Sequence, residues 1–270
     1  MRTGSETVGD ILRNWRQLRR FSQMGLANEA EISARHLSFV ESGRSRPSRE
    51  VLLRLAEPLQ LPLRERNRLF LASGYAPPHA EDAMHGPEMT AIKALIEQVL
   101  TAQMPYPALA VDRHWTLVSA NRALLGLIGG AAPHLLEPPV NVLRLSLSPD
   151  GLAPAIMNLA EWRHHILTRL RQDADTAGDL ALLGLYDELK ALPCPASVHP
   201  PRPPNAVAVP LVLRHPAIEG PLTLLSTTTV FGTATNVTLA ELTLECFYPA
   251  DAATRIALTR LGQEQASAGA

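Results

Sequence analysis

One short segment organises the first third of this chain: Ile32-Ser33-Ala34-Arg35-His36-Leu37-Ser38-Phe39-Val40-Glu41-Ser42-Gly43. It predicts a helix of about two and a half turns. The Ser33 hydroxyl can accept a free backbone N–H at the start, and Gly43 can adopt the left-handed conformation that ends a helix. Leu37 and Val40 lie three residues apart, so one side of this helix can be buried.

The neighbouring segments predict a helix-turn-helix. Upstream, Ser22 can cap another short helix that runs to about Ala30, so two helices are separated by only a few residues. Downstream, the basic loop Gly43–Ser48 can lie along phosphates, and Ser48 can cap a further helix. Polar groups near the start of a helix, facing away from its core, suit contacts with base edges in a DNA major groove. Ala34, Arg35, Ser38 and Phe39 face away from the buried side of this helix, and Arg35 and Ser38 supply the polar groups.

The distribution of charge favours the same partner. Residues 1–80 contain 13 Arg, no Lys and 8 acidic residues, which gives a formal charge of +5, while residues 81–270 carry −6. A polyanion would therefore bind the first part of the chain and be repelled by the second. A charge of +5 is also compatible with an ordinary solvated surface.

Residues 8–72 resemble the Cro/C1-type (XRE) helix-turn-helix repressors. The matching positions are Ser22, Gln23, Leu26, Ala27, Ile32, Ser33, Leu37, Glu41, Gly43, Arg44, Pro47 and Ser48. The resemblance implies a five-helix domain in which Gln23 contacts phosphate and braces the recognition helix, and Arg16 pairs with Glu41. It implies that Arg46, in the loop, grips the DNA backbone, and that His36 is either a phosphate contact or a surface residue. The full predicted DNA-binding set is Gln23, Ser33, Ala34, Arg35, His36, Ser38, Phe39, Arg44 and Arg46.

Two positions depart from that pattern. Glu31 stands in the turn where such motifs usually have glycine, and a non-glycine residue at positive φ costs about 1 kcal/mol or more. Gly25 lies inside the second helix, where glycine costs roughly 1 kcal/mol relative to alanine. Neither change removes a predicted DNA contact.

A second domain is expected after a proline-rich linker. We expect the helix-turn-helix domain at 1–75, the linker at 76–87, an α+β domain at 88–263 and a tail at 264–270. A helix is predicted from Pro87 to Ala102, followed by a hairpin over 108–119 and a helix capped by Asn121. A strand, a turn, a strand and an Asn-capped helix resemble the opening of a PAS-type sensor domain.

The rest of the second domain alternates between helical and strand patterns. Long helices are predicted over 154–172 and 177–192, then a proline-rich loop over 193–204 and a final helix over 252–261. Strands are predicted over 206–213, 221–230 and 239–248. The last alternates, with Leu242, Leu244 and Cys246 on one face and Glu241, Thr243 and Glu245 on the other, and this pattern is typical of a half-buried antiparallel strand.

Nearly the whole chain resembles regulators in which an MmyB-like ligand-binding domain follows an XRE helix-turn-helix. The resemblance rests on segments 35–41, 47–50, 63–67 and 74–77, and more weakly on 141–145, Trp162, His215-Pro216 and 222–229. It implies a PAS-like fold with an apolar pocket for a fatty-acid-like molecule, whose carboxylate would need an arginine. Because one helix-turn-helix offers a small footprint and two recognition helices about 34 Å apart can enter successive major grooves, we also expect a homodimer on an inverted-repeat DNA operator. The predicted ligand-binding residues are Arg144, Trp162, Arg163, Ile166, Tyr186 and Phe231.

Other functions find little support in the sequence. No metalloprotease, hydrolase, Walker or dinucleotide-binding motif occurs, and adjacent His164 and His165 point about 100° apart on a helix. We therefore expect no enzyme, no cofactor and no metal. Cys194 and Cys246 are too few for a disulfide framework, and the absence of a long apolar run or signal-peptide core predicts a cytoplasmic protein with no membrane contact. The alternative is a DNA-binding regulator whose second domain binds a protein partner.

Overall fold

A computed structural model describes residues 6–82, 86, 89–194 and 208–268. Within these residues the chain forms two compact units. The first contains residues 6–82 together with residues 233–240, and the second contains the remaining described residues. The chain therefore leaves the second unit once and returns to it. Over the described residues, no helix has both the length and the apolar character needed to cross a membrane.

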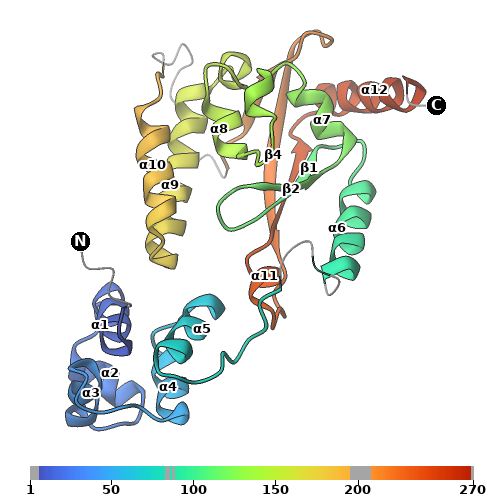
Figure 1. The fold of residues 1–270 in the computed structure, drawn as a ribbon. Coiled ribbons are helices and arrows are strands. Elements are labelled where there is room, and N and C mark those ends of the chain that lie inside the picture. The colour runs from blue at the N-terminus through green and yellow to red at the C-terminus, as the bar shows by residue number, and fades with distance from the viewer. Residues whose placement is uncertain (1–5, 83–85, 87–88, 195–207, 269–270) are drawn as a thin grey trace. The chain divides into compact units, whose positions relative to one another are not determined.

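The first unit is built from α1 (Val8–Leu18), α2 (Gln23–Glu29), α3 (Ala34–Glu41), α4 (Arg49–Ala56) and α5 (Leu63–Ala72) (Figure 1). The predicted caps are confirmed: the side chains of Ser22, Ser33 and Ser48 each accept a backbone N–H at the start of a helix. Gly43 has φ +73°, the left-handed conformation expected after α3. These local signals fix where the helices begin and end.

The core of the first unit forms where α1 and α2 meet α3. Leu37 and Val40, the predicted buried residues of α3, are fully buried and pack with Leu12 of α1 and Leu26 of α2. Gly9 of α1 lies so close to the end of α3 that a methyl group there would be 2.5 Å from the carbonyl oxygen of Glu41. Only glycine permits this approach of the two backbones.

Part of the expected linker, and a segment from far along the chain, belong to the first unit. The Asn67 amide of α5 exchanges two hydrogen bonds with the backbone of His79. The backbone N–H of Val237 donates to the carbonyl of Ala80 at 2.8 Å. Val237 begins α11 (Val237–Ala240), which contacts α5. The strand predicted over 239–248 therefore starts too early, because its first residues form this helical turn.

The second unit contains an antiparallel sheet of five described strands. They are β1 (Ala108–Val111), β2 (Leu117–Ala120), β3 (Leu211–Arg214), β4 (Pro221–Val230) and β5 (Thr243–Pro249), in the order β2-β1-β5-β4-β3. The predicted hairpin is confirmed as β1 and β2. The apolar run over 206–213 forms a strand only from Leu211, and residues 206–207 lie outside the described part of the chain. β5 lies between β1 and β4, at the centre of the sheet.

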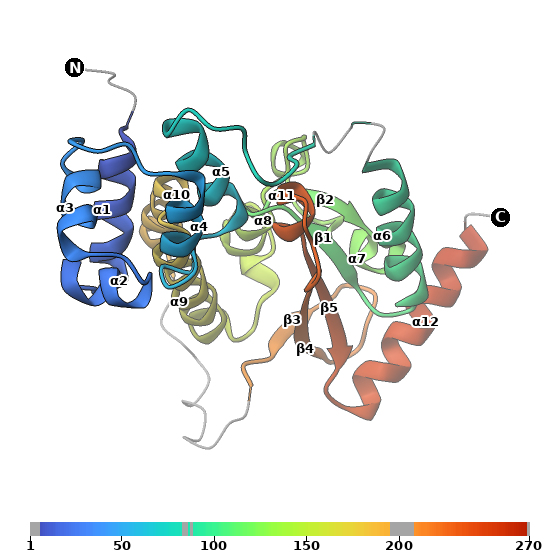
Figure 2. The same ribbon diagram turned by 90° about the horizontal axis from the view of Figure 1, so that it is seen from below.

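Helices cover both faces of this sheet (Figures 1 and 2). On one side lie α8 (Val142–Leu147), α9 (Leu159–Ala177) and α10 (Leu180–Ala191), and on the other lie α6 (Thr90–Ala102) and α12 (Ala252–Ala268). Helix α7 (Arg122–Ile128) follows β2 and is capped by Asn121, as predicted. Helix α9 starts later than expected because a 3-10 turn occupies 153–155. The expected combination of an all-α domain and an α+β domain is confirmed.

Candidate functional site

The helix-turn-helix is formed by α2, α3 and the turn between them. Glu31 lies in this turn with φ +52°, the strained conformation predicted for a residue that replaces glycine. Its carboxylate is exposed and approaches Arg54 only to 3.9 Å. Within the described part of the chain, the Glu31 side chain thus makes no short ion pair that would offset the backbone strain.

A charged network ties the three helices together, as the resemblance implied. The Glu41 carboxylate, at the end of α3, accepts hydrogen bonds from Arg16 at 2.6 and 3.0 Å and from the Gln23 amide at 2.8 Å. Burial acts to raise the pKa of Glu41, but these hydrogen bonds outweigh burial and hold the pKa below its ordinary value. The predicted bracing role of Gln23 is thus visible in the structure, because its side chain joins α2 to α3.

The predicted DNA-contacting face of α3 is accessible. Arg35 is exposed, whereas Ala34, His36, Ser38 and Phe39 are half-buried, and Ser33 is exposed at the start of the helix. The guanidinium groups of Arg35 and Arg44 lie 5.3 and 6.0 Å from the centre of the Phe39 ring. Cation–π contacts at these distances hold two positive side chains beside one aromatic residue.

Arg46 makes contacts that sequence reasoning did not predict. Its guanidinium donates to the carbonyl oxygens of Ser73 at 3.0 Å and Gly74 at 3.3 Å, and it lies 5.0 Å from the centre of the Tyr75 ring. These carbonyls are available because α5 ends there, with Gly74 at φ +74°. Arg46 therefore anchors the loop after α3 to the end of α5.

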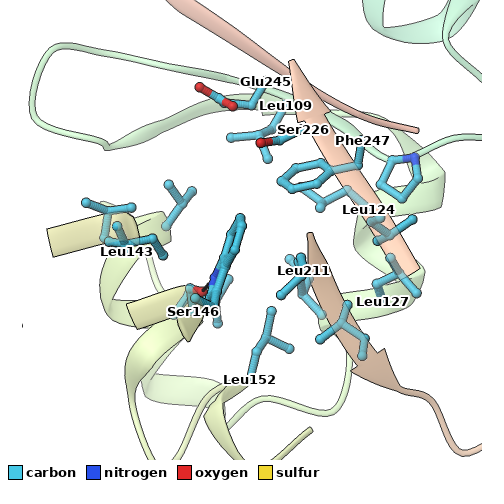
Figure 3. Close-up of a pocket in the computed structure, with 18 of the residues that line it drawn as sticks. Leu109, Leu124, Leu127, Leu143, Ser146, Leu152, Leu211, Ser226, Glu245 and Phe247 are labelled. Atoms are coloured by element: carbon cyan, nitrogen blue, oxygen red, sulfur yellow. Dashed lines mark hydrogen bonds between the residues drawn. The ribbon is translucent and has the colours of Figure 1, made fainter. Parts of the chain in front are cut away.

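The second unit contains a cavity of about 100 Å³ between α9 and the inner face of the sheet. One water needs about 10–15 Å³ on the same measure, so the space can hold a ligand of several atoms. Most of its wall is aliphatic or aromatic, and Figure 3 shows leucine side chains from helices, strands and loops surrounding the space. These include Leu109, Leu124, Leu127, Leu143, Leu152 and Leu211.

The predicted ligand-binding residues divide into two groups. Trp162 and Ile166 of α9 line the cavity, and the Trp162 indole donates to the Ser146 hydroxyl at 3.1 Å. The described residues that line this cavity do not include Arg144, Arg163, Tyr186 or Phe231.

The two predicted carboxylate partners are engaged elsewhere. Arg144 forms two hydrogen bonds of 2.7 Å with Glu188 on α10. Arg163 donates to backbone carbonyls at the end of α10. Tyr186, also on α10, lies beside Arg171 and Lys190. Long polar side chains can reach partners on neighbouring helices, and the amino-acid sequence alone does not reveal which helices are neighbours.

Sequence reasoning missed the polar end of the cavity. Arg169 of α9 and Glu245 of β5 both line it, with Nη2 of the arginine 2.7 Å from the carboxylate. The Thr228 hydroxyl of β4 donates to the same carboxylate at 2.9 Å. Glu245 was assigned to a solvent-facing side of its strand, and this is wrong: it is only 4% exposed. Its strand is central, and helix α9 covers the face that carries it.

Two further titratable groups lie near this pair. Burial, together with the positive charge of Arg169, lowers the pKa of His165, which also lines the cavity. Burial raises the pKa of Asp173, one turn after Arg169, against the opposing effect of that arginine. The Asp173 side chain is half-buried beside Trp115. Among the described residues, no group of His, Cys, Asp and Glu is arranged to hold a metal ion.

Comparison with known proteins identifies both units. A family model described as the MmyB-like transcription regulator ligand binding domain matches residues 92–261, and one described as a helix-turn-helix domain matches residues 7–69. Among solved structures, the clp gene regulator ClgR from Corynebacterium glutamicum is similar at 24% identity, covering 36% of this chain and 87% of that chain. Its TM-score is 0.23. No curated protein matches the chain.

Proposed function

The chain belongs to the family of MmyB-like transcription regulators, and from this premise we propose that it is a one-component regulator of operator DNA controlled by a fatty-acid-like molecule. Members of this family are regulators with a helix-turn-helix and a ligand-binding domain, not enzymes. A protein that binds chromosomal DNA acts where that DNA lies, so we place it in the cytoplasm. The observation that carries the proposal is the largely apolar cavity of the second unit, which is partly open.

An acyl chain suits this cavity because its wall is mostly hydrocarbon. Burial of each methylene group is worth about 0.8 kcal/mol, so affinity should rise with chain length until the space is full. Coupling to DNA further requires that the ligand bind one arrangement of the regulator better than another, since equal affinity shifts no equilibrium.

The ligand hypothesis is tested with the full-length protein after lipid removal. Saturated fatty acids and the corresponding primary alcohols of graded length are added, and the melting temperature and operator affinity are measured. Using two head groups separates the effect of chain length from that of the head. The expected result is stabilisation that rises with length and then levels off, together with a change in operator affinity. If no length in either series has an effect, the ligand hypothesis fails and a protein partner becomes the better explanation.

For DNA, we propose that Arg35 contacts guanine and that Arg44 contacts phosphate. Arg35 is the exposed side chain of α3 able to form two hydrogen bonds with one base, a contact worth about 1–3 kcal/mol of discrimination. With an operator selected from random DNA, Arg35→Ala should reduce the preference for operator over scrambled duplex. Arg44→Ala is the matched control and should weaken both duplexes alike, lowering the salt slope by about one. Unchanged selectivity in Arg35→Ala would refute the assigned face.

We also propose that the regulator binds as a homodimer. Two recognition helices must be about 34 Å apart to enter successive major grooves on one side of a duplex. One helix-turn-helix offers a small footprint for tight, specific binding. The selected operator should therefore be an inverted repeat, and sedimentation should show two chains on it. Selection of a single half-site would contradict the dimer.

A further inference from the structure

We propose that the ligand of this regulator carries an uncharged polar head group, because the cavity already contains a complete ion pair between Arg169 and Glu245. The inference rests on the proposed function, since it concerns the ligand of that same cavity. It goes further by assigning the chemical class of the head: an alcohol, ester or amide of an acyl chain, and not a free carboxylate.

The ion pair is a built part of the wall. The Arg169 guanidinium lies 2.7 Å from the Glu245 carboxylate and 4.6 Å from the centre of the Trp115 ring, so it is held by a charge and by an aromatic face. The Glu245 side chain is only 6% exposed, and its carboxylate also accepts a hydrogen bond from Thr228. Groups on α9, β4, β5 and the chain before β2 thus fix the pair from several directions.

The balance of charge then decides which head group fits. Of the described residues that line the cavity, Arg169 and Glu245 carry opposite charges, and His165 is kept neutral at neutral pH by its burial and by the nearby arginine. Asp173, beside Arg169, adds no positive charge. A carboxylate entering this space would be an unbalanced negative charge in a largely apolar environment, which is costly.

Among the described residues that line the cavity, Arg169 is the cation that a carboxylate could bind, and its guanidinium has donors beyond the Nη2 atom that meets Glu245. Sharing the guanidinium would place a second negative charge beside the Glu245 carboxylate, and displacing Glu245 would leave that carboxylate buried without its cation, so both arrangements are unfavourable. An uncharged head group needs neither rearrangement. Ser226 lies beside Glu245 at the same side of the cavity in the view of Figure 3, and its hydroxyl can both donate to and accept from a neutral group.

The test compares head groups at one chain length on the full-length, lipid-free protein. The probes are a fatty acid, its primary alcohol, its methyl ester and the corresponding primary amine, and their dissociation constants are measured at neutral pH. We expect the alcohol and the ester to bind at least about tenfold more tightly than the acid, a difference of about 1.4 kcal/mol. Tightest binding by the acid or the amine would overturn the inference.

Substitution of Glu245 gives an independent readout. Glu245→Gln keeps the size of the side chain, removes its charge and leaves Arg169 as an unpaired cation. The acid should therefore gain about tenfold or more in affinity, while the alcohol changes little. Glu188→Gln is the matched control, because it removes the same charge from the Arg144 pair outside the cavity lining, and the preference should stay that of the unmodified protein.

The possible failures are distinguishable. If no probe binds, the proposed function is overturned and the inference falls with it. If probes bind but the preference for a neutral head is absent, or Glu245→Gln leaves the ratio of acid to alcohol unchanged, only the inference is overturned. Melting of Glu245→Gln establishes whether it is folded, and the head-group series on the unmodified protein decides the matter even if that variant does not fold.

Discussion

Replacing Glu41 with glutamine should destabilise the whole DNA-binding unit. Glu41 joins three helices, because its carboxylate accepts hydrogen bonds from Arg16 on α1 and Gln23 on α2 while it ends α3. The Glu41 side chain is 1% exposed and that of Arg16 is 12% exposed. Glutamine keeps the shape but removes the negative charge, so a largely buried arginine loses its counter-ion.

The expected cost follows from these contacts. Breaking a buried ion pair by removing one partner costs about 3–5 kcal/mol. Arg16 keeps some solvent contact and a hydrogen bond of 3.0 Å to the carbonyl of Phe21, so we expect a loss nearer to about 2–3 kcal/mol. For a unit of this size, that loss lowers the melting temperature by roughly 10–20 °C.

The same carboxylate should make the unit sensitive to acid. Because the folded-state pKa of Glu41 lies below the ordinary value of 4.5, its ionisation stabilises the folded unit above that pH. The stabilisation is lost as the pH falls below 4.5 and through the depressed folded-state pKa. Glu41→Gln lacks a titrating group, so its stability should change less over this range of pH.

Hydrogen exchange on the full-length chain, followed in peptides from α1 and α3, measures both the loss of stability and its dependence on pH within the DNA-binding unit. The matched control is Glu50→Gln, which removes the same charge from a pair with Arg54 that is also short, at 2.7 Å, but has side chains 44% and 73% exposed. That control should cost less than about 0.5 kcal/mol. Equal losses of protection in the two variants, or an unaltered response to acid in Glu41→Gln, would refute the assignment of stability to the buried network.

Two further substitutions test the backbone of this unit. Gly9→Ala would place a methyl group 2.5 Å from the carbonyl oxygen of Glu41, so it should lower the free energy of unfolding by about 1–3 kcal/mol. Gly184→Ala on α10 is the control, because among the described residues no atom beyond its own helix and its chain neighbours lies within 4 Å of the added methyl group, and it should raise the stability of that helix by up to about 1 kcal/mol. Similar effects at both sites would contradict the close approach of α1 and α3. Glu31→Gly should stabilise the unit by about 1 kcal/mol because φ is +52° there, and unchanged unfolding in urea would show that the turn stores no strain.

The sequence alone determined most of the first unit. Its helices begin at side chains that accept their own backbone N–H groups, and α3 ends at a glycine with positive φ. These are interactions between residues a few positions apart, so the order of amino acids contains them directly. The strain at Glu31 and the pairing of Arg16 with Glu41 were also predictable, the first from the position of the turn and the second from the family resemblance.

Only the tertiary structure decided the chemistry of the cavity. Alternation along β5 separates two faces of the strand, but it cannot show that both are covered, and so Glu245 was assigned to solvent. The arginine that lines the cavity is Arg169, which pairs with Glu245. Arg144 and Arg163, which were expected there, instead bind partners on α10. Local patterns set the helices and strands, whereas the partner of each buried charge depends on which elements pack together, and that is a property of contacts between distant residues.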